Sequence, residues 1–383
     1  MDAITIIAVR VLIIMSRPHT LRARNSVRMK PLQTKRTAVA ISSGKPDAGP
    51  SRKREYGAHP RDAALHFTVA RIALDCLRAA CYGSALTPRG LTGIRHAKGN
   101  VRPKGQRIAI AVTVMLEQWS EGKAPPWGVQ GTGLKPGTLD RGRISWGTYG
   151  GKIGVWRIMN LLRENGVRGT FCVNAHCAEI WPEAAKAIVT SGHDIAGHGY
   201  LQDHLLAYMT PEEEKDSIKQ SLGILEKISG TRPHGWISPV LAWTEHTTEY
   251  LAAEGLAWHG DWLDIDLPRV KQAKSSPIAL IPASDFTDSR VSHSGPTVLW
   301  DVYKDTFDYL YLREAPAFLG LTLHCHFGGR PLVCAVFDRI LKYFAQFPDV
   351  WFASHGQVAR WVLDQNIEAE THAKRHPAGH GVS

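Results

Sequence analysis

Residues 107–116 read RIAIAVTVML, a nearly continuous run of apolar side chains rich in β-branched residues. Such a run predicts a strand that is buried on both faces, as in a parallel sheet covered by helices. The chain before it is interrupted by Gly and Pro, so we predict that the folded body begins at Arg107. The stretch 118–150 that follows is too long for an ordinary connection, and we predict a functional loop there.

Helical and strand patterns alternate after this first strand. Residues 155–165 carry apolar side chains at helical spacing, and 169–174 have the pattern of a short strand. Thr210 is a candidate N-cap, with Pro211 at the first helical position and acidic residues in the first turn. Further helices or strands are predicted over 179–192, 193–198, 244–255, 278–283, 321–327, 332–347, 350–354 and 355–363. The alternation predicts an α/β fold with a parallel sheet, open or closed into a barrel.

The positive charge of the chain is confined to its first part. The formal net charge is +11, yet residues 1–106 hold 20 Lys and Arg against 5 Asp and Glu, which leaves the remainder at −4. We predict a basic, disordered extension over 1–55, a poorly defined helical linker over 56–106 and a tail over 366–383. The extension has no aromatic residues for base stacking, so no nucleic-acid partner is expected. No apolar run reaches the roughly 20 residues that cross a bilayer, so no membrane partner is expected either.

The cysteine pattern bears on the compartment. No C-x-x-C pair or zinc-finger spacing occurs among the cysteines, which are Cys76, Cys81, Cys172, Cys177, Cys325 and Cys334. This argues against a disulfide framework or a structural zinc module. We therefore predict a reducing, cytoplasmic location.

Polar side chains suited to acid–base chemistry follow several predicted strands. These residues are Glu117, His198, Asp261, Asp264, His324 and His326. The carboxyl ends of parallel strands meet at one edge of a sheet or barrel, which is where such folds place their chemistry. Together these residues supply a carboxylate, an imidazole and a second acid group, the minimum for general acid–base hydrolysis.

Five sequence blocks resemble, in order, the motifs of the polysaccharide deacetylase (NodB-homology) family. They are RIAIAVTVMLE, GHDIAGHGYLQDH, GTRPHGWISP, WHGDWLDIDLP and LTLHCHFGGRP. The fourth block and the segment WGTYGGKIGVWRIMNLL resemble the allantoinase-like branch of that family. The resemblance implies a distorted (β/α) barrel over 107–365 that hydrolyses a carbon–nitrogen bond other than a peptide bond.

The sequence also departs from the family pattern. Met115 stands where the family has its catalytic Asp, and Gln202 stands where it has the second zinc-binding His. Methionine cannot take a proton, and an amide is a poor zinc ligand. A zinc site would combine His198 with Asp203 or His204. Allantoinase-like relatives work without metal, so a zinc-bound and a metal-free site both remain open.

The remaining polar residues can be given roles. Glu117 is the candidate base that activates water, and the resemblance places the leaving-group acid at His324, with His326 nearer solvent. Asp261 or Asp264 is the candidate that orients the imidazole. Arg232 is a candidate for binding an anionic group, with a structural ion pair as the alternative. The candidates for substrate binding are Trp236, Ser238, Trp262, Asp264, His326 and Arg330.

Three functions remain open at this point. The first is ring opening of a small cyclic amide such as allantoin, and the second is N-deacetylation of a carbohydrate or chitooligosaccharide. The third is a catalytically dead barrel that binds a small ligand, because Met115 and Gln202 replace family residues. A live enzyme requires Glu117, His198 and His324 to converge on one cavity. The expected partner is a small-molecule or oligosaccharide amide, and a homo-oligomer is left open.

Overall fold

The computed structural model describes residues 105–126, 133–135, 137–291, 294–369 and 372–376. The predicted extension, nearly all of the predicted linker, and Cys76 and Cys81 lie outside these residues. In the described part, no helix has the length and apolar character needed to span a membrane. The other cysteines are free and buried: Cys172, Cys177, Cys325 and Cys334.

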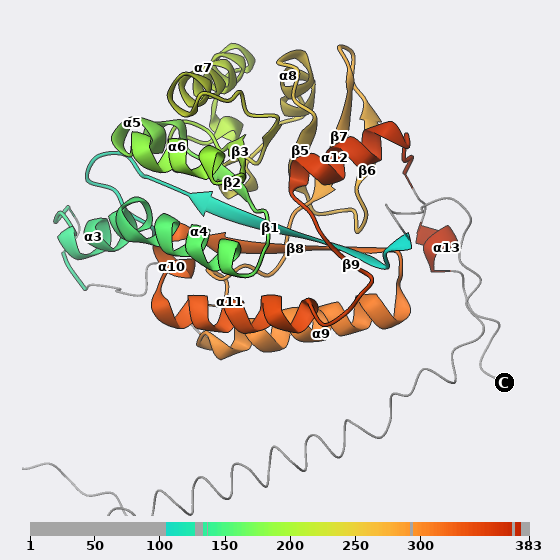
Figure 1. Ribbon diagram of the computed structural model, residues 1–383. Helices are drawn as coiled ribbons and strands as arrows, with labels where there is room; N and C mark the ends of the chain where they lie inside the picture. The colour runs from blue at the N-terminus through green and yellow to red at the C-terminus, as the bar shows by residue number, and fades with distance from the viewer. Residues whose placement is uncertain (1–104, 127–132, 136, 292–293, 370–371, 377–383) are drawn as a thin grey trace, which may run out of the picture. The chain divides into compact units, whose positions relative to one another are not determined.

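One nine-stranded sheet forms the centre of the described part (Figure 1). Its order is β6-β7-β5-β4-β3-β2-β1-β8, and β9 also pairs with β1. All pairs are parallel except β6 with β7. The strands are β1 (Ile108–Leu116), β2 (Thr170–Val173), β3 (Asp194–Gly197), β4 (Gly235–Trp236), β5 (Trp258–Trp262), β6 (Arg269–Gln272), β7 (Pro277–Pro282), β8 (Ala317–His324) and β9 (Val350–Phe352). The sheet curls into an open half-barrel, so the predicted α/β barrel-type fold is confirmed.

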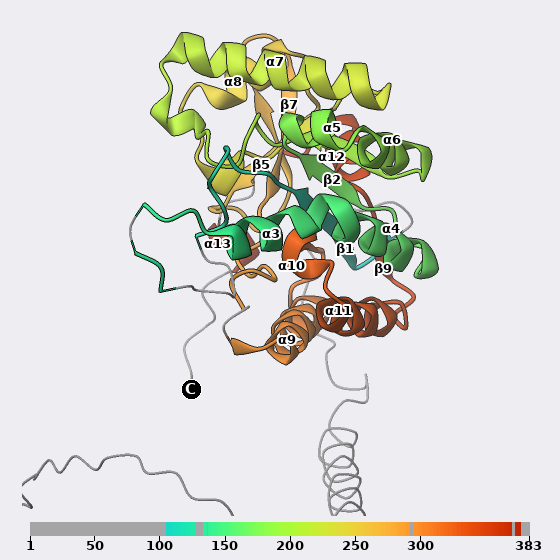
Figure 2. The same ribbon diagram turned by 90° about the vertical axis from the view of Figure 1, so that its left-hand side faces the viewer.

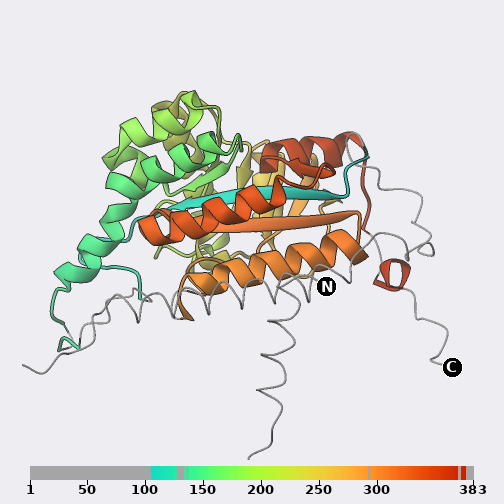
Figure 3. The same ribbon diagram turned by 60° about the horizontal axis from the view of Figure 1, so that its bottom comes forward.

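Helices cover the outer face of the sheet. Figures 1 and 3 show α9 and α11 side by side along the β1–β8 pair. The described helices are α3 (Arg141–Tyr149), α4 (Val155–Glu164), α5 (Ala175–Ile180), α6 (Pro182–Thr190), α7 (Pro211–Ser229), α8 (Thr247–Ala253), α9 (Thr297–Arg313), α10 (Cys325–Gly328), α11 (Pro331–Phe344), α12 (His355–Asp364) and α13 (His372–Arg375). Single turns of other helical types are η2 (Gly150–Gly154), η3 (Leu206–Tyr208) and η4 (Pro239–Leu241).

Strand β1 explains how the core and the site share one sheet. All nine of its residues are buried. Alternate side chains of a strand point to opposite faces, and Ile108, Ile110, Val112, Val114 and Leu116 pack into the outer core beneath the helices. The other row packs inward as Ala109, Ala111 and Met115, together with residues of α12. Residue 117 is the next position in this alternation, so its side chain is also expected to face inward.

The predicted cap of α7 is confirmed. The Thr210 hydroxyl accepts from the Glu213 N–H, and the Glu213 carboxylate accepts from the Thr210 N–H, which is a capping box. Gly230, at φ +78°, ends the helix in the left-handed conformation that glycine adopts without strain. Local sequence signals thus set both ends of this helix.

The stretch 118–150 contains α3 rather than a loop alone, so the prediction of a long irregular connection was incomplete. Helix α3 continues through η2 into α4, and Figure 2 shows this run beside α10. The glycines of η2 permit the contact, because a Cβ on Gly154 would overlap the carbonyl oxygen of Cys325. A Cβ on Gly151 would overlap the ring of Trp181. This close packing fixes the segment that follows β8.

Two other predictions of secondary structure were wrong in detail. The predicted strand over 321–327 ends at His324, and the following residues form α10. The predicted helix over 179–192 belongs to two helices that meet at Trp181, before Pro182. Helix α9 was not predicted.

Candidate active site

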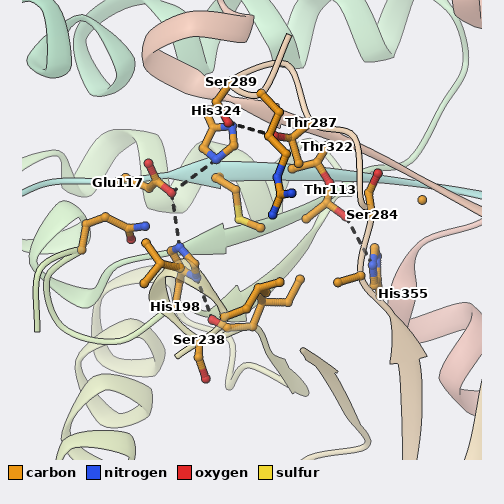
Figure 4. Close-up of a pocket in the computed structure, with 18 of the residues that line it drawn as sticks. Thr113, Glu117, His198, Ser238, Ser284, Thr287, Ser289, Thr322, His324 and His355 are labelled. Atoms are coloured by element: carbon orange, nitrogen blue, oxygen red, sulfur yellow. Dashed lines mark hydrogen bonds and ion pairs between the residues drawn. The ribbon is translucent and has the colours of Figure 1, made fainter. Parts of the chain in front are cut away.

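Three side chains from three strand ends line one cavity. Glu117 follows β1, His198 follows β3, and His324 ends β8. Glu117 Oε1 lies 3.4 Å from His198 Nε2 and 3.7 Å from His324 Nε2. Figure 4 shows both imidazoles turned toward the carboxylate. The cavity measures about 450 Å³, so the convergence that a live enzyme requires is present.

Glu117 is ionised at neutral pH. Burial by itself would raise its pKa, but the positive charge of His324 and the contact with His198 outweigh burial and lower the pKa of Glu117 to about 2. Its side chain is almost fully buried, and Oε2 has no hydrogen-bond partner among the described residues. A buried, ionised oxygen gains strongly from any proton donor that reaches it.

His324 is held by Asp288, a residue that sequence reasoning missed. The Nδ1 atom of His324 lies 2.6 Å from Asp288 Oδ1. The backbone N–H of His324 donates to Asp288 Oδ2 at 2.7 Å. Burial would lower the pKa of His324, but the carboxylates of Asp288 and Glu117 raise it to about 9. The imidazole is therefore protonated at neutral pH, with Nε2 on the side that faces Glu117.

His198 is fixed by the opposite wall. Its Nδ1 lies 2.6 Å from the backbone carbonyl of Ile237 and must donate to it, so Nε2 is left to face Glu117. Asn174 joins the loops that carry Glu117 and His198. Its side-chain oxygen accepts from the Gln118 N–H at 3.0 Å, and its amide donates to the His198 carbonyl. No sequence signal marks Asn174 as a residue of the site.

The rest of the cavity combines hydroxyl groups with an apolar wall. Its described lining includes Met115, Ile237, Leu241 and Pro282 on the apolar side. The polar lining residues are Thr113, Gln202, Ser238, Ser284, Thr287, Ser289, Arg290, Thr322 and His355. Of these, only Ser238 was predicted as a site residue. Burial lowers the pKa of His355 to about 4, so its imidazole is neutral.

The structure contradicts the predicted roles of Asp261 and Asp264. Asp261 lies within β5 and is buried against His259, with Oδ2 2.7 Å from Nε2. Its other oxygen accepts from the Ser238 N–H at 2.8 Å. Asp261 therefore supports the cavity wall from behind and does not contact His324. Asp264 is exposed and does not line the cavity.

Arg232 forms a structural ion pair, which was the alternative to the predicted binding of an anionic group. Its guanidinium lies 2.9 Å from a carboxylate oxygen of Glu226 and 2.9 Å from one of Glu254. Because Arg232 precedes β4, it lies toward the amino ends of the strands, away from the cavity. It is not a residue of this site.

The predicted aromatic and rim residues also lie elsewhere. Trp236 is fully buried in a core cluster and donates to the Ser238 hydroxyl at 3.0 Å. Trp262 packs against Trp243, at 4.7 Å between ring centroids, and does not line the cavity. Arg330 lies 3.6 Å from the ring centroid of Tyr149 and donates to backbone carbonyls.

His326 is not the solvent-facing histidine that the sequence suggested. It is fully buried at the start of α10, edge-on to Trp119 and Trp146 at 5.4 Å and 5.0 Å. Burial lowers the pKa of His326 to about 3, so the ring is neutral. Because the chain turns into a helix after His324, His326 supports Glu117 from behind, at 3.8 Å from Oε2, and does not line the cavity.

The donor set does not fit a family-type zinc site. Asp203 pairs with Lys123 at 2.8 Å and accepts from the Ser120 N–H, and His204 lies against the Ser120 hydroxyl. The predicted partners of His198 are thus engaged elsewhere. No group of three His, Cys, Asp or Glu side chains placed to hold a metal occurs among the described residues. Catalytic zinc takes three protein ligands, and near His198 the cavity offers the Glu117 carboxylate and the Gln202 amide.

Comparisons with known proteins agree with this fold. The polysaccharide deacetylase family model matches residues 140–258. A peptidoglycan deacetylase of Helicobacter pylori is 23% identical, over 58% of this chain and 88% of the relative. A peptidoglycan deacetylase-like protein of Gibberella zeae is 25% identical, over 72% of this chain and 93% of the relative. The crystal structure of PuuE allantoinase is 26% identical, with a TM-score of 0.62, over 77% of this chain and 100% of that one.

The chain is therefore similar to the polysaccharide deacetylase family, over residues 140–258 for the family model and over 77% of its length for the PuuE allantoinase structure.

Proposed function

We propose that the chain hydrolyses a small amide, with ring opening of a cyclic ureide of the allantoin type as its most fitting reaction. One observation carries the proposal. A buried, ionised Glu117 and a protonated His324 face each other at 3.7 Å across a cavity of about 450 Å³. A cavity of this size encloses a single small ring.

The pair divides the work of hydrolysis between them. Water held by Glu117 attacks the carbonyl carbon, and the carboxylate takes the proton that the water loses. The protonated Nε2 of His324 gives its proton to the leaving nitrogen as the carbon–nitrogen bond breaks. A simple amide gives a carboxylic acid and an amine, whereas a cyclic ureide gives a carboxylic acid and a ureido group that both stay on the opened molecule.

The electrostatics of the pair account for how Glu117 can serve as a base. The charge of His324 contributes to the low pKa of Glu117 in the resting site. That charge keeps Glu117 in the carboxylate form that can take the proton of the attacking water. When His324 afterwards gives its own proton to the leaving nitrogen, the charge is lost and Glu117 holds the proton it has taken. His198 keeps the carboxylate in place throughout, because its ring is anchored to the Ile237 carbonyl.

The main alternative is N-deacetylation of a carbohydrate. The family model and the two peptidoglycan deacetylase relatives favour it. Two features favour the small amide: Met115 replaces the family's catalytic Asp, and the predicted zinc partners of His198 are engaged elsewhere. A catalytically dead barrel is disfavoured, because the three required side chains converge. A reducing compartment remains a prediction, supported by the four buried, free cysteines.

A substrate panel with and without chelator tests the proposal. The full chain is incubated with allantoin, hydantoin, hydantoin-5-acetic acid, N-acetylglucosamine and its oligomers, each with and without EDTA, and the products are quantified by chromatography. We expect opening of a cyclic ureide at a rate that EDTA leaves unchanged. Release of acetate from the sugars, abolished by EDTA, would instead establish a metal-dependent deacetylase.

A further inference from the structure

Arg290 is a charged residue of the cavity that the proposed reaction does not use. Among the described lining residues it is the one Arg or Lys, and it shares the cavity with Glu117 and His324. An arginine keeps its positive charge across the working pH range. Its guanidinium has no hydrogen-bond or ion-pair partner among the described residues.

The loop that carries Arg290 is anchored to the catalytic strand. Asp288, two residues earlier, holds His324 by two contacts of 2.6 Å and 2.7 Å. Thr287 forms a parallel bridge with Thr322 of β8, and its hydroxyl lies 2.8 Å from that of Ser289. Figure 4 shows Thr287 and Ser289 beside His324 on one wall of the cavity. The backbone at Arg290 is thus placed by the same contacts that place the general acid.

Glu117 is the one carboxylate of the described cavity lining, and both it and the buried Asp288 beside the cavity are already engaged. Glu117 lies against His198 and His324, and Asp288 is bonded to His324. No described carboxylate therefore remains in the cavity to neutralise Arg290. Arg290 is exposed at the rim of the cavity, and a guanidinium presents two parallel N–H groups that match the two oxygens of a carboxylate.

We propose that Arg290 binds a carboxylate carried by the amide substrate and makes the site selective for acidic small amides. This inference rests on the proposed function, because it concerns the substrate of the same site. The substrate class is a small ring or acyl amide with one carboxylate. The carboxylate binds at Arg290, which leaves the amide carbonyl free to lie near Glu117 and His324.

A matched pair of ligands tests the inference by binding. Hydantoin-5-acetic acid and hydantoin-5-acetamide share a ring and differ in one charge. Their dissociation constants are measured by calorimetry with the full wild-type chain and with Arg290→Gln, Arg290→Lys and Arg360→Gln. Arg360 is an exposed arginine of α12 that does not line the cavity, so its variant controls for loss of one positive charge.

We expect the wild type to bind the acid about ten- to a hundredfold more tightly than the amide, as for a charge-assisted hydrogen bond. Arg290→Gln removes the preference, Arg290→Lys keeps part of it, and Arg360→Gln leaves it unchanged. Equal binding of acid and amide by the wild type overturns the inference. So does a preference that survives Arg290→Gln, or no binding of the acid at millimolar concentration. If the acid binds through Arg290 but no amide of any class is hydrolysed, the inference stands and the proposed function falls.

Discussion

Asp288→Asn removes the negative charge that holds His324 in its protonated form. The substitution keeps the size of the side chain, and the amide oxygen can still accept from the His324 N–H. The amide nitrogen then faces Nδ1 of His324, which lies 2.6 Å from Asp288 Oδ1 in the wild type. Nδ1 must become an acceptor, so the imidazolium is disfavoured.

The size of the effect follows from the pKa of His324. At its pKa of about 9, His324 is almost fully protonated at pH 7.5. Without Asp288 the pKa of His324 falls to its ordinary value of 6.5 or below, because burial then acts with less opposition. At pH 7.5 the protonated fraction drops roughly tenfold, and misplacement of the ring raises the total loss in kcat to about a hundredfold or more.

The assay is a pH–rate profile from pH 5 to 10 on the substrate identified by the panel. In the wild type the active form has Glu117 ionised, which holds above a pKa of about 2, and His324 protonated, which holds below about 9. The rate therefore stays level through neutral pH and falls as the pH rises through about 9. Asp288→Asn moves that fall from about pH 9 toward the ordinary pKa of 6.5, a shift of about 2.5 pH units.

The matched control is Asp285→Asn, an exposed acid on the same loop that does not contact His324. It should leave both the rate and the profile unchanged. A wild-type rate at pH 7.5 in Asp288→Asn, together with an unshifted basic limb, would refute the assignment of His324 as the acid.

Three further predictions concern stability and the other candidate residues. Gly154→Ala should lower the free energy of unfolding by about 3 kcal/mol or more, because the added Cβ would overlap a backbone oxygen. The control Gly223→Ala, which has open space around it, should be neutral or stabilising by up to about 1 kcal/mol. Calorimetry measures both. Arg232→Ala should leave kcat within about twofold of the wild type, because its ion pairs lie away from the cavity; a large loss of turnover in a folded variant would contradict that placement. His324→Ala should lower turnover by about a hundredfold to ten-thousandfold, and it should also lower Tm because buried Asp288 loses its partner. His326→Ala should lower Tm because it empties a buried position, but it should leave most of the turnover; equal losses of turnover in the two would argue against the division of roles.

The sequence predicted the sheet and the central triad of side chains because both depend on local signals. Apolar runs of strand length located β1, β2, β3 and β8, whose predicted parallel alignment is confirmed. Parallel strands bring their carboxyl ends together, so residues directly after them meet. The sequence therefore correctly predicted that Glu117, His198 and His324 converge, although they are far apart along the chain.

It failed where a role depends on long-range packing. Asp288 lies in a loop 36 residues before His324, and nothing in its neighbourhood marks it as the partner of that histidine. Asp261 was read as a strand-end residue, but β5 continues to Trp262, so the carboxylate is enclosed beside His259. His326 lies in the helix α10 that begins directly after β8, so its ring does not follow the alternation of the strand and lies behind the site.

The central claim is that a buried carboxylate at position 117 activates water for hydrolysis of a small amide. It is tested most directly by the opening rate of the cyclic ureide with the wild type and with Glu117→Gln, which keeps the shape of the side chain and removes its basicity. The account predicts a loss in kcat of about a hundredfold to ten-thousandfold, with an unchanged Tm and with wild-type activity insensitive to EDTA. A Glu117→Gln variant that opens the ring at the wild-type rate would contradict it.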